Sequence, residues 1–426
     1  MKTKVVSILS IFVVQLWMVS SASAALTAIV GGTVVNLEGG KPLKDAVILI
    51  DGERIAQIGT RAEVDIAAGT QIIDAAGQWL IPGMMNMHVH LGIILPGKLA
   101  AELAHETEAE VALRMAANAE KILQAGVTTV RLPGEHRYGD IALKKSINKG
   151  ESHGPRIFTA GEAVVITGGH GSEAGVIYAD GPHELVKAVR KQVSLGADWV
   201  KILISGGIAT DGGDIAKALM TPEEINAVVD AAHRFGVKVA AHSGSPAATE
   251  VAVEAGVDSI EHGYMLDRAV LKKMARAGTW LVPTIVVSQP ATQPFFEAIG
   301  SPPWYLERRN AVGKLHWEAL RTAVAENVNI ALGTDQLPDE PNDGTTATVR
   351  EAEYYVAAGM TPLQALRAAT IEPAKMLGAD QDIGSLEVGK YADIVAVAAD
   401  PAADISALRS IRIVMKGGTI YRQDTN

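Results

Sequence analysis

Short apolar runs alternate with helical patterns along the chain from Gly126 onward. This alternation is typical of βα repeats whose strands form a parallel sheet. Eight strand candidates follow one another: "QWLIPG", which leads to His88, "VTTVRL" from Val127, "PRIFTAG" from Pro155, "DWVKILIS" from Asp198, "VKVAAHS" from Val237, "DSIEHG" from Asp258, "WLVPTIV" from Trp280 and "NIALGTD" from Asn329.

The helical patterns between these runs carry their own start and stop signals. In "TPEEINAVVDAAHRFG", Thr221 is a suitable N-cap, Pro222 fits the first turn, and Gly236 is a stop signal. Eight strands with intervening helices predict a (β/α)8 TIM barrel, a fold of about 250 residues whose active sites lie at the C-terminal ends of the strands. We assign residues 83–376 to this barrel.

The flanking segments, residues 25–82 and 377–426, have alternating strand patterns broken by Gly and Pro turns. Together they predict one small β domain built from both ends of the chain.

The first 24 residues have the pattern of a secretory signal peptide. Lys2 and Lys4 precede an apolar run, which is followed by the small residues Ala22, Ser23 and Ala24. An uncleaved membrane anchor is the alternative, but polar residues interrupt the run and it is short for a membrane span. We therefore expect cleavage after Ala24 and an exported mature protein, periplasmic or secreted and not attached to a membrane.

Composition narrows the function further. The chain has 426 residues, 48% of them hydrophobic, and a formal net charge of -10, which disfavours a nucleic-acid partner and leaves a small molecule as the expected one. It has no cysteine, so disulfides, thiolate ligands and a cysteine nucleophile are excluded. Any metal must be bound through nitrogen and oxygen.

Ionisable side chains recur at the ends of the predicted strands. Residues at i and i+2 of an extended segment point to the same side, about 7 Å apart, so one metal ion can contact both His88 and His90. The full set on the predicted rim is His88, His90, Lys201, His242, His262 and Asp335. Neutral imidazoles and a carboxylate suit a divalent ion such as zinc.

A protonated Lys201 would repel such an ion, and a charged amine is costly to bury on an apolar strand. Carboxylation by carbon dioxide would convert the amine into a carbamate whose two oxygens can bridge two metals. A salt-bridged or snorkelling lysine is the alternative. A metal pair would make a water molecule nucleophilic near neutral pH, and Asp335 is placed to orient it and transfer its proton.

The motifs "HVH", "AHSG", "IEHG" and "LGTD", with Lys201 in the fourth strand, resemble the amidohydrolase superfamily in content and order. The resemblance implies His88 and His90 on a buried α metal, His242 and His262 on a β metal, carboxylated Lys201 between them, and Asp335 on the α metal as the proton shuttle. It implies two divalent cations, zinc by preference, and the two flanks as halves of a small β-sandwich.

Further motifs, "TTVR", "GEAVVITGGHG", "KILISGG" and "VPTIV", resemble the branch of imidazolonepropionase-like proteins, prolidase-like dipeptidases and ochratoxin-degrading amidohydrolases. The usual acid after the strand-two arginine is missing, because Leu132 follows Arg131. The branch implies a substrate whose amide joins an acyl group to an amino acid with a free carboxylate. His170, in a Gly-rich loop, is the first candidate to bind that carboxylate, with Arg131 and His136 as further candidates.

Two other function classes remain open for the same rim. One is a single-metal ring deaminase or cyclic-amide hydrolase, although deaminases of this superfamily usually have an "HxxE" after strand five, whereas Ser243, Gly244 and Ser245 follow His242 here. The other is an exported binding protein without catalysis, which the complete set of rim residues disfavours.

The remaining histidines, His105, His153, His183, His233 and His316, are assigned to the surface or to packing. Trp304 and Tyr305, in segment 302–310, are candidates for a lid, with helix packing as the alternative. We also expect a homo-oligomer.

Overall fold

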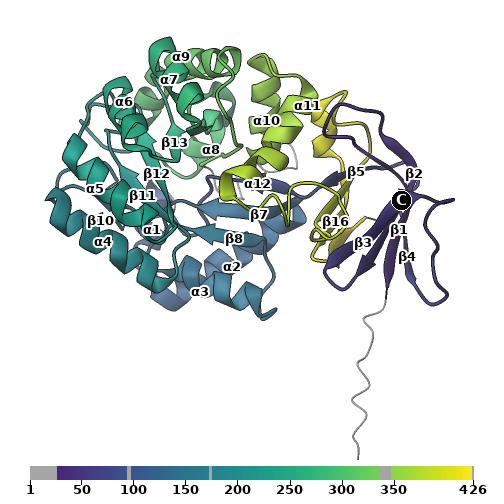
Figure 1. Ribbon diagram of the computed structural model, residues 1–426. Coiled ribbons are helices and arrows are strands. Elements are labelled where there is room, and N and C mark those ends of the chain that lie inside the picture. Colours follow the sequence, from purple (N-terminus) through teal and green to yellow (C-terminus); the bar gives the residue numbers. More distant parts are fainter. Residues whose placement is uncertain (1–25, 94–96, 172–174, 336–346, 425–426) are drawn as a thin grey trace, which may run out of the picture.

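The structure is a computed structural model that describes residues 26–93, 97–171, 175–335 and 347–424. Figure 1 shows a large α/β body with a smaller β region at one end, where the C-terminus also lies. The predicted signal peptide, residues 1–24, lies outside the described residues. No helix in the described ranges has the length and apolar character needed to cross a membrane.

The smaller region is one eight-stranded sheet made from both ends of the chain. Its order is β17-β16-β15-β5-β1-β2-β3, and β4 pairs with β1. The junction is the antiparallel pairing of β5 with β15, in which Trp79 lies opposite Val397. Where a β-sandwich was expected, the strands from both ends of the chain are therefore hydrogen-bonded into a single continuous sheet. Its strands are β1 (Thr27–Val34), β2 (Leu43–Asp51), β3 (Arg54–Thr60), β4 (Gln71–Asp74), β5 (Trp79–Pro82), β15 (Ile394–Val397), β16 (Ile411–Lys416) and β17 (Thr419–Gln423).

The larger body contains two parallel sheets. One has three strands in the order β6-β7-β8, and the other has six in the order β10-β9-β11-β12-β13-β14. The described strands thus form a parallel α/β fold, and they do not join into one closed barrel sheet. The strands are β6 (Met84–Asn86), β7 (Val127–Leu132), β8 (Arg156–Thr159), β9 (Val164–Val165), β10 (Ile177–Tyr178), β11 (Trp199–Leu203), β12 (Lys238–Ser243), β13 (Ser259–His262) and β14 (Trp280–Val282).

Three strand predictions need correction. The first run, "QWLIPG", forms β5 of the smaller sheet, and the strand that leads to His88 in the larger body is β6. The eighth run, from Asn329, forms only one parallel bridge, Ile330 to Leu281, although its backbone also accepts a hydrogen bond of 2.7 Å from Met87 N. The seventh run ends at Val282, because Pro283 has no N–H to donate and Thr284 has a left-handed φ of 52° that turns the chain into a 3-10 segment. The seventh and eighth runs still bring their ends to the same edge of the body.

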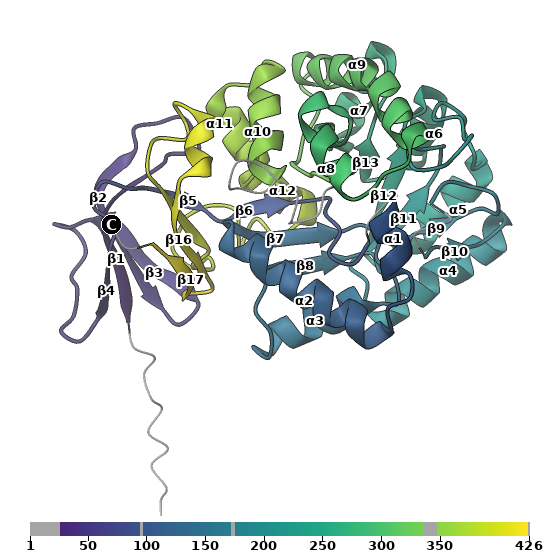
Figure 2. The same ribbon diagram turned by 180° about the vertical axis from the view of Figure 1, so that it is seen from behind.

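Helices cover the outside of these sheets, as Figures 1 and 2 show from opposite sides. Helix α5 begins as predicted: the Thr221 side chain accepts a hydrogen bond from Glu224 N, and the Glu224 side chain accepts one from Thr221 N. Its buried face, including Ile225 and Val228, belongs to the same core as Val200 and Val239 of the sheet. The longer helices are α2 (Glu108–Gln124), α3 (Gly139–Asn148), α4 (Gly181–Leu195), α5 (Pro222–His233), α6 (Pro246–Ala255), α7 (Arg268–Ala277), α9 (Pro303–Ala325) and α10 (Ala347–Ala357). The shorter ones are α1 (Lys98–Leu103), α8 (Gln293–Ala298), α11 (Pro362–Ala368), α12 (Ile371–Leu377), η1 (Ile285–Ser288), η2 (Pro290–Thr292) and η3 (Ile405–Arg409).

Candidate metal centre

One cavity is lined by all six ionisable residues singled out on the predicted strand ends. The register explains part of this convergence: Leu203 lies opposite His242 in the pairing of β11 with β12, and Ser243 lies opposite His262 in the next pair. His88 and His90 follow β6 directly, and Asp335 ends the run that contacts β14. The chain therefore concentrates nitrogen and oxygen donors at one edge of its parallel strands.

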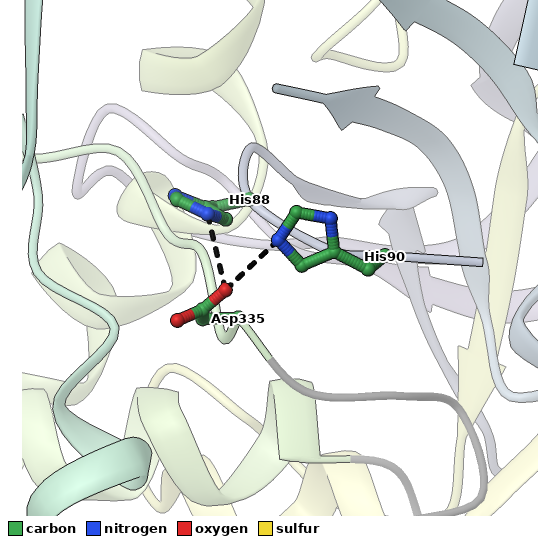
Figure 3. Close-up of side chains that lie close together, drawn as sticks. All are labelled: His88, His90 and Asp335. Atoms are coloured by element: carbon green, nitrogen blue, oxygen red, sulfur yellow. Dashed lines mark hydrogen bonds and ion pairs between the residues drawn. The ribbon is translucent and has the colours of Figure 1, made fainter. Parts of the chain in front are cut away.

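The tightest group is His88, His90 and Asp335 (Figure 3). Asp335 Oδ1 lies 3.1 Å from His88 Nε2 and 3.0 Å from His90 Nε2. One donor atom from each residue lies within 4.8 Å of the other two. Two imidazoles and a carboxylate at this spacing fit a divalent cation with a preference for nitrogen and oxygen ligands.

Three further histidine rings continue the cluster. The ring centroids of His88 and His262 are 4.9 Å apart, those of His262 and His242 are 4.6 Å apart, and those of His242 and His170 are 4.4 Å apart. Burial, and next the neighbouring His170, holds the pKa of His242 well below its ordinary value. Burial and the nearby His242 do the same to the pKa of His262. Both rings are therefore neutral at physiological pH, the form in which imidazole binds metals.

Asp335 and His90 share a strong polar contact. Burial opposes ionisation of the carboxyl, but the adjacent His88 and His90 rings hold the pKa of Asp335 well below its usual range. Burial also opposes the charge of His90, yet the hydrogen bond and the charge of Asp335 raise the pKa of that ring overall. An ionised carboxylate is thus kept at the centre of the cluster.

Lys201 is almost wholly buried, with 3% of its surface exposed, and it lines the same cavity. Burial, opposed by the charge of Glu261 and reinforced by that of Arg131, lowers the pKa of its amine to about 8. Among the described residues, none accepts a hydrogen bond from Lys201 Nζ. In the described part of the chain, Lys201 is therefore not paired with a carboxylate in a salt bridge. Its lowered pKa increases the fraction of neutral, nucleophilic amine.

Three non-glycine residues of the site have a left-handed backbone: His262 with φ 68°, Thr284 with φ 52° and Asp335 with φ 56°. Such conformations cost about 1 to 3 kcal/mol each and persist only where the surroundings hold them. Thr284 Oγ1 lies 2.7 Å from His262 Nδ1, so two of the three strained residues contact one another. Two of the cavity donors, His262 and Asp335, therefore have backbone conformations that their surroundings must hold in place.

The predicted substrate-binding residues separate into one that lines the cavity and two that do not. His170 lines it, its Nδ1 lies 2.6 Å from Thr210 Oγ1, and burial and then the Lys201 charge lower the pKa of its ring to about 4. His136 is half-buried outside the lining. Arg131 is fully buried and donates two hydrogen bonds of 2.6 Å to Glu261, so its prediction as a substrate ligand is corrected: its charge is already paired inside the protein.

Sequence reasoning missed two acids at the site. Glu135 lines the cavity and accepts hydrogen bonds from the backbone N–H groups of Leu91 and Gly92, and burial raises the pKa of its carboxyl to about 7. Glu261 lies behind His88, with Oε2 at 2.8 Å from Nδ1. Glu261 immediately precedes His262 in "IEHG", and its place on a buried strand was the available signal.

The far wall of the cavity is apolar, and part of the predicted lid contributes to it. Phe295 and Phe296 of α8, with Ile299, lie on this wall. Residues 303–310 form the first turns of α9, and Tyr305 lines the cavity whereas Trp304 does not. Of the remaining histidines, His316 is buried and bonded to the carbonyls of His262 and Pro283, while the exposed ones are His105, His153, His183 and His233.

Comparison with known proteins agrees with this geometry. Residues 79–421 match the family model described as "Amidohydrolase family". Ochratoxinase of Aspergillus niger is 30% identical over 437 aligned positions, which cover 95% of this chain and 88% of that protein. Imidazolonepropionase of a Geobacillus species (strain WCH70) is 24% identical, covering 83% of this chain and 84% of its own. A crystal structure of a Xaa-Pro dipeptidase with bound methionine in the active site superposes with a TM-score of 0.82 at 32% identity, covering 93% of this chain and all of that one.

These relatives include each of the three groups that the sequence motifs indicated. Structural neighbours of this family imply a TIM barrel with an extra domain, in keeping with the parallel α/β body and its separate sheet. The chain therefore belongs to the amidohydrolase family of metal-dependent hydrolases that act on carbon–nitrogen bonds.

Proposed function

We propose that this protein is a binuclear metal-dependent amidohydrolase that cleaves the amide bond of an N-acyl amino acid or a dipeptide with a free carboxylate. The observation that carries the proposal is the single cavity lined by His88, His90, Lys201, His242, His262 and Asp335. Four imidazoles, a carboxylate and a buried amine are more donors than one cation needs.

The donors divide into two sets. His88, His90 and Asp335 would hold one cation, since their donor atoms already lie within 4.8 Å of one another. His242 and His262 would hold the second, with carboxylated Lys201 between the two. Carboxylation joins the neutral amine nitrogen to the carbon of carbon dioxide and releases one proton, and the lowered pKa of Lys201 favours the neutral amine that this reaction needs. Zinc is the proposed metal, because imidazole nitrogens and carboxylate oxygens are its ordinary ligands in catalytic sites.

When bound, the cations supply Lewis-acid polarisation of water and of the amide carbonyl. The chain's own residues supply proton transfer and orientation. Asp335 accepts the proton of the attacking water and passes it to the leaving amide nitrogen, which needs it to depart as a neutral amine. The apolar wall of Phe295, Phe296 and Ile299 limits water around the reacting amide.

The relatives support the substrate class. One relative is named an ochratoxinase and another a Xaa-Pro dipeptidase, a name that refers to a dipeptide substrate, and the structure of the dipeptidase holds methionine, a free amino acid, in its active site. In this chain His170 would donate from Nε2 to such a carboxylate, because its Nδ1 already lies against Thr210. A side chain at position 207 would lie 2.2 Å from that Nε2, so Gly207 leaves the space that His170 occupies.

We also infer from the sequence that residues 1–24 direct export, that residues 83–376 form a (β/α)8 barrel, that residues 25–82 and 377–426 form the composite β domain, and that the chain forms a homo-oligomer. Edman sequencing of the protein recovered from the producing cells tests cleavage after Ala24.

The central experiment combines metal analysis with a substrate panel. Full-length enzyme is expected to contain about two metal ions per chain, as a bridged pair requires, and to hydrolyse N-acyl amino acids and dipeptides. Lys201→Ala should abolish turnover and regain part of it with short carboxylic acids that replace the carbamate, whereas Lys187→Ala, an exposed lysine of α4, should behave as the parent. One metal per chain with ammonia release from ring substrates, or unchanged turnover in Lys201→Ala, would refute the proposal.

A further inference from the structure

A charged pair lies buried directly behind His88. Arg131 of β7 and Glu261 of β13 each have no exposed surface. Arg131 Nη2 lies 2.6 Å from both carboxylate oxygens of Glu261, and Glu261 Oε2 lies 2.8 Å from His88 Nδ1. The order of contacts is therefore guanidinium, carboxylate, imidazole.

The pair has the partners that a buried ion pair needs. Arg131 Nε donates to the Met87 carbonyl at 2.6 Å, and Nη1 donates to Ser259 Oγ at 2.9 Å. Ser259 Oγ in turn donates to Glu261 Oε1 at 2.6 Å, and the guanidinium carbon lies 4.7 Å from the centre of the Trp199 ring. Because both charges are paired and bonded on several sides, their positions are fixed.

These contacts determine which nitrogen of His88 faces the cavity. A carboxylate accepts but cannot donate, so Nδ1 must carry the proton and Nε2 keeps its lone pair. That Nε2 is the atom 3.1 Å from Asp335 Oδ1. His90 has the same arrangement with a weaker partner, since its Nδ1 lies 2.7 Å from the neutral carbonyl of Gly134.

We propose that Glu261 is a positioning residue of the metal centre, which fixes the tautomer and the ring orientation of His88, and that Arg131 holds Glu261 in place. The inference rests on the metal centre proposed above. Glu261 does not line the cavity, so it acts through His88 and not on the substrate. Arg131 also binds the backbone of Met87, the residue before His88, and thereby positions the ligand's main chain as well as its ring.

The test measures metal affinity. Glu261→Gln retains the size of the side chain but removes its charge. Glu351→Gln is the matched control, because Glu351 is an equally buried carboxyl whose oxygens accept hydrogen bonds from Ile285 N and Val286 N, and not from a cavity donor. Full-length proteins are stripped of metal, and Zn²⁺ alone is titrated in competition with a chromophoric chelator.

Glu261→Gln should raise the Kd for Zn²⁺ by about 10- to 100-fold, whereas Glu351→Gln should stay within about twofold of the parent. Excess Zn²⁺ should restore much of the kcat of Glu261→Gln, which a general folding defect would not allow. Parent-like Zn²⁺ affinity in Glu261→Gln would overturn the inference.

A second variant covers the case in which Glu261→Gln does not fold. Glu261→Asp keeps the charge beside Arg131 but shortens the side chain by one carbon, so the carboxylate is withdrawn from His88. Weakened Zn²⁺ binding in folded Glu261→Asp is expected, and parent-like binding would also overturn the inference. A parent protein that binds no Zn²⁺ would instead refute the metal centre itself, so the two failures are distinguishable.

Discussion

Asn86, the last residue of β6, links three separate parts of the chain beside the metal centre. Its side chain is 1% exposed. Asn86 Nδ2 donates to Thr334 Oγ1 at 2.9 Å and to Thr348 Oγ1 at 3.1 Å, and Asn86 Oδ1 accepts from His88 N at 3.1 Å. The residue therefore joins the first ligand segment to the segment that ends at Asp335 and to helix α10.

Asn86→Ala removes these three hydrogen bonds and leaves the His88 N–H without its acceptor. A typical intramolecular hydrogen bond contributes about 1 kcal/mol net, and a buried donor without a partner adds to the loss, so we expect a destabilisation of about 3 to 4 kcal/mol. Asn226→Ala is the control, because Asn226 is exposed on α5 and bonds only to the Pro222 carbonyl within its own helix. A surface change of this kind should stay within about 0.5 kcal/mol.

The assay is urea unfolding of the metal-free chain, followed by tryptophan fluorescence, to which Trp79, Trp199 and the later tryptophans contribute. Removal of metal separates the hydrogen-bond loss from any change in ligand binding. The reasoning would be refuted if Asn86→Ala lost no more unfolding free energy than Asn226→Ala.

Three further predictions concern chemistry and pH. Asp335→Asn should retain bound metal, measured by elemental analysis, yet lose at least about 100-fold in kcat, because an amide cannot accept the proton; near-normal kcat would exclude Asp335 as the shuttle. His170→Ala should lower kcat/KM by about 1.5 to 3 kcal/mol for substrates with a free carboxylate and much less for carboxyl-amidated analogues; equal losses on a matched acid and amide pair would contradict carboxylate binding. Burial raises the pKa of Glu351 to about 8, so the folded chain keeps a proton that the unfolded chain releases above its ordinary pKa of 4.5. The stability that this proton contributes is present below pH 4.5 and is lost as pH rises toward 8, by up to about 1.4 kcal/mol per pH unit. Unfolding free energies at pH 5 and pH 8 should therefore fall more steeply for the parent than for Glu351→Gln, and parallel slopes would disprove the assignment.

The convergence of the cavity donors was predictable because it follows from one geometric rule. Parallel strands place their C-terminal ends at the same edge, so ionisable residues after successive apolar runs must meet there. The pairing of β11, β12 and β13 does this for His242 and His262 without any knowledge of distant contacts. Local pattern was sufficient for these positions.

Local pattern was not sufficient for Arg131. Its sequence neighbours do not reveal Glu261, whose carboxylate neutralises it from another strand. A buried ion pair forms between two segments that are distant in the sequence. While the acidic partner is unknown, an arginine at the end of a predicted strand is easily interpreted as a residue that binds the substrate. The same limit explains the run from Asn329, whose apolar residues predict a strand although only Ile330 forms a ladder bridge.

The pairing of β5 with β15 also determines when the small sheet can be completed during synthesis of the chain. The ribosome makes Trp79 before Ile394, so β5 has no antiparallel neighbour until the α/β body between the two strands has been synthesised. Until then the N-terminal strands present an unpaired edge, the feature that makes nascent sheets prone to aggregation. A chain that stops before Ile394 would contain all the cavity donors, yet the edge of β5 that pairs with β15 would stay open.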